Sequence, residues 1–406
     1  MGVFSNIKKT DSRNILFLVI LSLLPRLTYF FNELFSADGL PIAYDTDWYL
    51  EHAYAFLSSY KVNPDMEGVF YFGYYSLLAI LLWVFKTYST VVLIQMITNA
   101  LSVILVYRIA QILFNTRTAI IAGVIYAFNF QVIYWSIFII TDSLFISILL
   151  FTVYVLLMSY QSDKKSYRYL FAASSLYMVI LRPTGIVTLT FIFVYIMINL
   201  DFTAIKTFWT GRRQLLLYGG LLAAIFVIFY TLTSGRVAPL FYSLQDYLGY
   251  LLREFYATGR MFDIETPYDY KYSARMDSNY FSNFAVSFFI NNWNNILVLY
   301  GRRALSFIGV WVWKFGELDV LTKLKYLIPF SIAGSLGFIG LAGIFKKKIL
   351  KEASILFLVI LSIQFFCIFF FMDSAFRYRV PSLVFIGIII AYGLDRTIDF
   401  IKKLFI

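Results

Sequence analysis

The chain has 406 residues, of which 61% are hydrophobic and only 14% are charged, against roughly 25% charged in ordinary soluble domains. This composition excludes a soluble globular protein and indicates an integral, multi-pass membrane protein, because several nearly uncharged runs reach the ~20 residues that cross a bilayer. The net charge of +11 would suggest nucleic acid as the partner of a soluble protein, but here we assign it to cytoplasmic loops that contact anionic membrane lipid, with no nucleic acid partner.

Apolar segments recur along the chain and predict an all-α polytopic fold with about ten transmembrane helices, forming a single membrane domain over residues 1–406. The expected spans are about 15–31, 90–113, 118–138, 142–160, 168–181, 184–200, 214–233, 326–345, 353–372 and 380–395. Basic clusters lie between them at 8–13, 117, 164–168, 212–213, 346–348 and 402–403. If the N-terminus is cytoplasmic, every cluster falls on the cytoplasmic side, as the positive-inside rule requires. We therefore expect both termini in the cytoplasm of a cell-membrane protein.

The segment Phe70–Phe85 is apolar but only ~24 Å long as a helix, which is short for a span. If it crossed the membrane, two basic clusters would move outside, so we interpret it as a helix at the outer interface, with spanning as the alternative. This layout predicts two large extracytoplasmic loops, about 32–89 and 234–325. The second loop contains Leu297–Trp313, an apolar segment interrupted by arginines, which is typical of an amphipathic helix anchored at a surface.

The first outer loop carries the stretch YDTDWYLEHAYAF, in which Asp45 and Asp47 precede the only histidine, His52. Polar groups beside membrane spans are functional candidates, and a carboxylate facing an outer cleft could take a proton from an attacking hydroxyl. The alternative is that either aspartate caps the helix that begins at Trp48. We interpret His52 as a helix-surface residue, because one histidine and one cysteine do not supply a usual zinc site. A divalent cation between carboxylates is compatible with these acids but not indicated, so the cofactor is left open.

Arginines form a second set of candidates, most clearly in SAFRYRVP, where Arg377 and Arg379 flank Tyr378 on the outer side. Guanidinium groups bind phosphate bidentately, so this segment predicts a phosphate site at the depth of the membrane interface. The alternative is that these arginines extend to lipid headgroups.

Three further regions supply candidates for substrate contacts. Arg182, in LRPTG, lies at a predicted helix break and is a third candidate for phosphate, with a structural salt bridge to Asp142 as the alternative. Asp142 itself, at the start of a span, is a candidate substrate-binding residue. In the second outer loop, Glu254 and Arg260 belong to an aromatic stretch of a kind that grips sugar rings, although a lid packed on the membrane face fits the same composition.

The order of these motifs resembles the membrane glycosyltransferases of the GT-C class, above all glycosyltransferase family 39 with its protein O-mannosyltransferase and aminoarabinose-transferase relatives. In that family an aspartate follows the first span in a D-x-x-x-Y-x-x-x-A pattern, which Asp45, Tyr49 and Ala53 match. Four later segments also resemble features of the family. ITDSLF has an acid at a later outer span end, LRPTG matches an arginine-proline-threonine-glycine step, and FRYRVP matches an R-Y-R-x-P pattern near the C-terminus. On the cytoplasmic side, LFNTR is similar to a Leu-Phe-Gly-Arg step. Many members have Asp-Glu at the first acid, whereas Asp45 is followed here by Thr46 and then Asp47, which leaves open which aspartate is the base. The histidine of the aminoarabinose-transferase metal site is missing from the second outer loop.

This resemblance implies a GT-C-like fold and inverting transfer of a monosaccharide from a polyprenyl-phosphate donor to a hydroxyl acceptor at the outer membrane face. Asp45 or Asp47 would deprotonate the acceptor, which is a glycan, a lipid or a protein. The donor phosphate would be held by Arg377, Tyr378, Arg379 and Arg182. The rival interpretation is a transporter or flippase of an anionic amphipathic substrate such as a lipid-linked sugar, because acids and arginines near membrane depth suit that function too.

Overall fold

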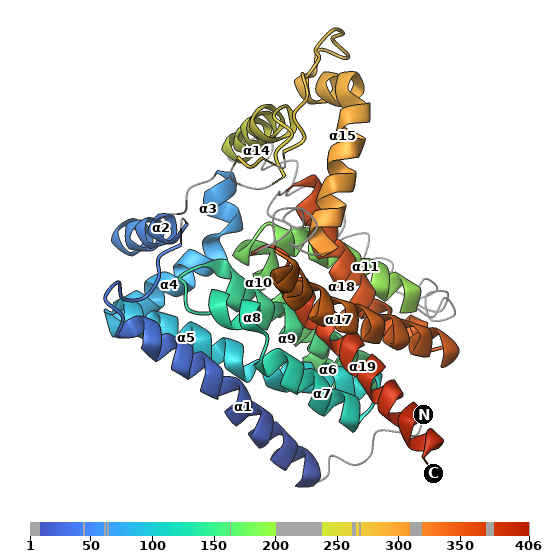
Figure 1. Ribbon diagram of the computed structural model, residues 1–406. Coiled ribbons are helices and arrows are strands. Elements are labelled where there is room, and N and C mark those ends of the chain that lie inside the picture. The colour runs from blue at the N-terminus through green and yellow to red at the C-terminus, as the bar shows by residue number, and fades with distance from the viewer. Residues whose placement is uncertain are drawn as a thin grey trace, which may run out of the picture.

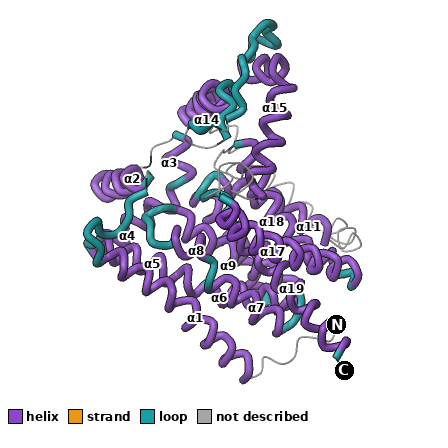
Figure 2. The backbone as a smooth tube through the Cα atoms, viewed as in Figure 1, coloured by secondary structure: helices purple, strands orange, loops and turns teal. Residues whose placement is uncertain are grey.

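In the part of the chain that it describes, the computed structural model consists of helices joined by loops, and no strand occurs there (Figure 2). The described residues are 9–43, 45–60, 62, 65–162, 164–199, 238–261, 265–267, 269–308, 319–370 and 377–405. Five segments within them are long and apolar enough to cross a membrane: Asp11–Leu34, Tyr88–Leu113, Thr141–Gln161, Val320–Lys346 and Leu350–Phe369. These findings confirm an all-α polytopic membrane protein. The number of spans, their sidedness and the two outer loops stay predictions, and the span expected at 214–233 lies outside the described residues.

The helices follow one another through short connections in the first half of the chain (Figure 1). They are α1 Lys9–Leu34, α2 Thr46–Ser59, α3 Met66–Phe70, α4 Phe72–Phe85, α5 Tyr88–Leu101, α6 Val103–Leu113, α7 Thr116–Ala127, α8 Phe130–Trp135, α9 Thr141–Gln161, α10 Lys165–Leu181 and α11 Thr184–Asn199. The second half contributes α14 Ala238–Leu251, the π-helical turn η1 Leu252–Tyr256, α15 Phe284–Ile308, α17 Val320–Lys346, α18 Leu350–Phe369 and α19 Val380–Leu404.

The helix predicted over 118–138 is wrong, because the structure divides it into α7 and α8. The break falls at Asn129, whose backbone is extended and whose side chain accepts a hydrogen bond from the Val132 amide at 3.2 Å. Asparagine competes with the helical backbone in this way, and it therefore favours caps over helix interiors. The chain then turns through residues 136–140 before α9 begins, which places the start of α9 beside the start of α2, where Thr46 donates to the Ile139 carbonyl at 3.2 Å.

The main core surrounds α9, whose side chains are buried along most of its length. Within the bundle, α17 and α19 approach closely at glycines. A Cβ atom at Gly393 would lie inside contact distance of the Leu336 carbonyl, and one at Gly340 would meet the Ile389 carbonyl. Small residues allow such backbone contact between membrane helices, where packing rather than water exclusion drives association.

Helices α14 and α15 project from one end of the bundle (Figure 1) and have a small apolar core of their own. Two polar contacts join this unit to the end of α18: the Tyr256 hydroxyl donates to the Phe369 carbonyl at 2.5 Å, and Arg303 Nη1 donates to the Ile368 carbonyl at 3.1 Å. The guanidinium of Arg303 also donates to the Arg260 carbonyl, and Arg303 is fully buried. The sequence predicts that the arginines of Leu297–Trp313, Arg302 and Arg303, anchor a surface helix, with contact to lipid phosphate as the alternative. For Arg303 this prediction is wrong, because its buried guanidinium donates to the Ile368 carbonyl in the last turn of α18.

Candidate functional site

Four charged side chains from distant parts of the sequence form one row of alternating sign, which we call the charged quartet: Asp45, Arg377, Asp142 and Arg182. Arg377 Nη1 donates to Asp45 Oδ2 at 2.6 Å, and its Nε donates to Asp142 Oδ2 at 2.7 Å. The other oxygen of Asp142, Oδ1, accepts from Arg182 Nη1 at 2.6 Å. The salt bridge expected as the alternative for Arg182 is therefore present. The two carboxylates and two guanidiniums sum to zero charge.

Burial increases along this row. The Asp45 side chain is 32% exposed, Arg377 is 10% exposed, and Asp142 is fully buried with Arg182 beside it. A buried carboxylate is tolerated when cations and hydrogen bonds compensate for the lost hydration, and Asp142 has two guanidiniums to do this. Asp142 also lies in the first turn of α9, where the helix dipole favours negative charge.

Local backbone breaks present each of these side chains. Asp45 is the N-cap residue of α2, yet its side chain makes no capping bond, so the capping role considered for Asp45 is wrong and its carboxylate is directed to Arg377. Arg182 follows the last residue of α10 in an extended conformation, with φ −166° and ψ 141°. Arg377 belongs to the turn just before α19.

Both arginines of the quartet are held in the charged form. Burial alone would lower the pKa of Arg377, but the carboxylates of Asp142 and Asp45 outweigh burial and raise this pKa well above its ordinary value. The pKa of Arg182 is also raised, because Asp142 outweighs its burial. Between them lies Tyr378, whose ring centroid is 4.5 Å from the Arg182 guanidinium carbon and 5.4 Å from that of Arg377. Burial raises the pKa of the Tyr378 phenol well above its usual range, so this hydroxyl stays a hydrogen-bond donor.

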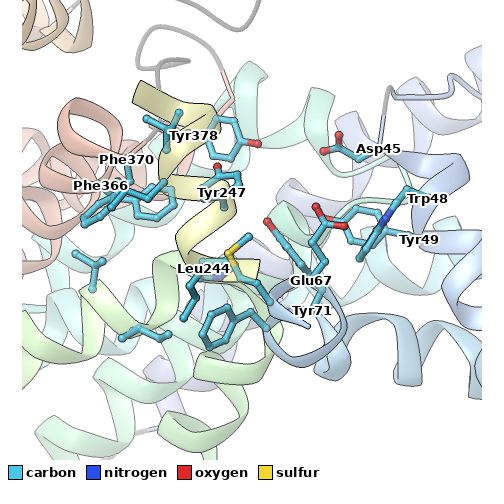
Figure 3. A pocket seen from close by; sticks show the side chains of 17 residues that line it. Asp45, Trp48, Tyr49, Glu67, Tyr71, Leu244, Tyr247, Phe366, Phe370 and Tyr378 are labelled. Carbon is cyan, nitrogen blue, oxygen red and sulfur yellow. The ribbon is translucent and has the colours of Figure 1, made fainter. Parts of the chain in front are cut away.

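A cavity of about 620 Å³ opens beside the charged quartet and is lined by both Asp45 and Tyr378 (Figure 3). Its apolar walls come from α11, α14 and the end of α18, with side chains such as Ile186, Leu244, Leu248, Phe366 and Phe370. Its polar part gathers Asp45, Glu67, Tyr71, Tyr247 and Tyr378. The cavity therefore has a long apolar surface next to one patch of carboxylates and phenols.

The structure does not bring every predicted site residue to this cavity. Asp47 is exposed in the first turn of α2, and Glu254 is exposed in η1. Arg260 lies against the Phe255 ring at 5.4 Å. The Nη1 group of Arg379 donates to the Phe307 carbonyl at 3.0 Å. None of these four is among the described residues that line the cavity, and neither are Arg377, Asp142 and Arg182, which are buried in the charged quartet.

The structure also adds residues that sequence reasoning missed. Glu67 precedes an apolar segment in the predicted first outer loop, so, like Asp45, it is a carboxylate beside an apolar helix and could have been selected on that ground. Tyr247, on α14, carried no comparable signal, because its place in the cavity wall depends on tertiary packing.

No metal site emerges from the described ranges, where no group of three or more His, Cys, Asp or Glu side chains could hold an ion. His52 stacks on Trp48 with ring centroids 3.8 Å apart, and its Nδ1 lies 2.9 Å from the Trp48 carbonyl oxygen. His52 is thus half-buried among aromatic rings on one side of α2.

Comparison with known proteins identifies one family. Residues 72–233 match the family model described as dolichyl-phosphate-mannose-protein mannosyltransferase. No curated protein matches the chain. The matched segment includes Asp142 and Arg182, whereas Asp45 and Arg377 lie on either side of it. The predicted resemblance is thus confirmed over these residues, which are similar to a family of membrane glycosyltransferases.

Proposed function

We propose that this protein transfers a monosaccharide from a polyprenyl-phosphate donor to a hydroxyl acceptor at the outer membrane face, with inversion at the sugar carbon. One observation carries the proposal beyond the family match. The Asp45 carboxylate is held 2.6 Å from a buried guanidinium and lines a cavity whose other walls are apolar. A lipid-linked sugar has this polarity, with an apolar chain next to a polar reacting group.

Asp45 is the proposed general base. It lines the cavity, whereas the exposed Asp47 does not, which favours Asp45 between the two. A base must lie within hydrogen-bond reach of the hydroxyl that it deprotonates. The ion pair with Arg377 fixes the orientation of one carboxylate oxygen, Oδ2, so the second oxygen can face the acceptor.

Arg377, Arg182 and Tyr378 are the proposed partners of the donor phosphate. The departing phosphate gains negative charge as the bond to the sugar breaks, and donors fixed in advance stabilise that charge in the transition state. Arg182 Nη2 is buried and has no hydrogen-bond partner within the described part of the chain, so it retains donor capacity. Arg379, bonded to a backbone carbonyl, has a smaller part in this proposal than the sequence predicted.

A transport function receives no comparable support. The family match is to transferases. We therefore retain the transferase proposal alone.

The test is sugar transfer by the purified protein in proteoliposomes, with a panel of polyprenyl-phosphate monosaccharides and hydroxyl acceptors. Removal of a general base lowers the rate by roughly 10²- to 10⁴-fold, so Asp45→Asn should lose activity to that extent while it still binds the donor. Asp47→Asn tests the other assignment and should retain most of the activity. Full activity of Asp45→Asn would remove this residue from the mechanism, and wild-type protein that uses no donor of the panel would reject the proposed function.

A further inference from the structure

The cavity has a second carboxylate that the proposed chemistry does not use. Glu67 lies on α3 and lines the same cavity as Asp45 (Figure 3). Its side chain is exposed to that space, and among the described residues none forms a hydrogen bond or ion pair with its carboxylate. Asp45, by contrast, is neutralised by Arg377. Glu67 is therefore the one described lining residue with uncompensated charge.

The short helix that presents Glu67 is fixed on several sides. The Asp65 side chain accepts from the Gly68 amide at 2.6 Å, and the Tyr75 hydroxyl donates to the Gly68 carbonyl at 2.9 Å. The Met66 amide donates to Ser243 Oγ, on α14, at 2.8 Å. Such contacts hold the backbone of α3 in place, and with it the point from which the Glu67 side chain extends into the cavity.

Aromatic rings line the same cavity as this carboxylate. Trp48 and Tyr71 are among them (Figure 3). The indole of Trp48 packs edge-on against Tyr71 with ring centroids 5.6 Å apart and is stacked on His52. The rings are thus immobilised before any ligand arrives, which lowers the entropy cost of binding.

The part of the cavity lined by Glu67, Trp48 and Tyr71 is suited to bind a ligand that carries hydroxyl groups. An ionised carboxylate only accepts hydrogen bonds, and its two oxygens can take two donors at once. A phosphate would be repelled by Glu67, so the phosphate belongs at the Tyr378 side of the cavity and the sugar at the Glu67 side. A carboxylate beside immobilised aromatic rings can receive two neighbouring hydroxyl groups of a sugar while a ring covers the apolar face of that sugar.

We propose that Glu67 is a specificity-determining residue that accepts hydrogen bonds from two neighbouring hydroxyls of a sugar ring; this inference rests on the proposed function. The ring belongs either to the donor monosaccharide or to a sugar of the acceptor, and both present the same chemistry. The Michaelis constants for the two substrates distinguish these sources.

The experiment compares Glu67→Gln with wild type in the proteoliposome transfer assay, with Glu33→Gln as the matched control. Glu33 is an acid on α1 that does not line the cavity. Hydrogen bonds to charged groups contribute enough that Glu67→Gln should lower kcat/KM by roughly 10- to 100-fold. A rise in KM for the donor alone assigns the donor sugar, and a rise in KM for the acceptor alone assigns the acceptor sugar. The melting temperature of Glu67→Gln should equal that of wild type, because the side chain has no structural partner.

Substrates that lack one hydroxyl complete the test. Wild type should lose roughly the same factor on the correct deoxy sugar as it loses through Glu67→Gln, and the variant should lose little more on that substrate, because the interaction is already absent. If wild type transfers sugar but Glu67→Gln matches it on all substrates, this inference is overturned while the proposed function stands. If wild type transfers no sugar, both fail.

Discussion

Replacement of Asp142 by asparagine should be among the most destabilising isosteric changes in this protein. The carboxylate is fully buried and holds two guanidiniums, Arg182 at 2.6 Å and Arg377 at 2.7 Å. Removing one partner of a buried ion pair typically costs about 3–5 kcal/mol, because an uncompensated charge is left behind. Asp142→Asn leaves two cations with one carboxylate, Asp45, so we expect a loss near the upper end of that range.

The same geometry predicts an order among related variants. Arg182→Gln leaves Asp142 paired with Arg377 and should cost less than Asp142→Asn. Asp45→Asn should cost only about 1 kcal/mol or less, because Asp45 is 32% exposed and Arg377 keeps its bond to Asp142. The double variant Asp142→Asn/Arg182→Gln should cost less than the sum of its single changes, because one of the two stranded cations is gone.

The assay is equilibrium unfolding in mixtures of mild detergent and dodecyl sulfate, followed by tryptophan fluorescence, which gives the free energy of unfolding for each variant. Asp47→Asn is the control, since an exposed substitution usually changes stability by no more than about 0.5 kcal/mol. Equal losses for Asp142→Asn and Asp45→Asn, or a wild-type free energy for Asp142→Asn, would refute the assignment of Asp142 as the centre of the quartet.

Three further predictions follow from other parts of the molecule. Gly393→Ala should destabilise the protein by about 1–3 kcal/mol, because its Cβ would collide with a carbonyl of α17. Gly337→Ala is the control and should be tolerated, because the nearest atom to a Cβ added there is 3.8 Å away. Equal unfolding free energies for the two variants would contradict the close contact of α17 with α19. Arg303→Gln should speed amide hydrogen exchange in α14 and α15, measured by mass spectrometry, because it removes a hydrogen bond to α18. Unchanged exchange would contradict this prediction and show that apolar contacts alone hold these two helices in place. Burial raises the pKa of the Tyr378 phenol well above its ordinary value, so this group should not titrate near pH 10, where free tyrosine ionises. The dependence of transfer activity on pH should therefore have the same shape there in Tyr378→Phe as in wild type. A change of activity near pH 10 that wild type shows and Tyr378→Phe lacks would disprove this prediction.

Hydropathy and charge sufficed to predict the fold class, because the length of apolar runs is imposed by the bilayer and not by tertiary detail. The break at Asn129 was missed because a capping asparagine inside an apolar run carries little weight in a hydropathy pattern. The end of α15 was predicted to lie at a surface because two adjacent arginines looked alike in sequence. The structure separates them, since Arg302 is exposed and Arg303 is buried.

The candidate site was predictable in part from the charge pattern of the loops. The positive-inside rule predicts Asp45 and Arg377 on the same side of the membrane, although 332 positions separate them in the sequence. Sequence could not tell which of two neighbouring arginines, Arg377 or Arg379, joins the carboxylates, because that choice depends on the turn before α19. Nor could it assign Glu67 to the same cavity, since part of the cavity wall comes from α14, far along the chain.

The charged quartet also sets the order in which the site can be assembled during synthesis. Asp142 and Arg182 are 40 positions apart and can pair once α9 and α10 have been made. Arg377 precedes the final helix, so the Asp45 carboxylate waits unpaired until almost the whole polypeptide has left the ribosome. A nascent or truncated chain that ends before this residue would therefore hold the Asp142–Arg182 pair without its connection to Asp45.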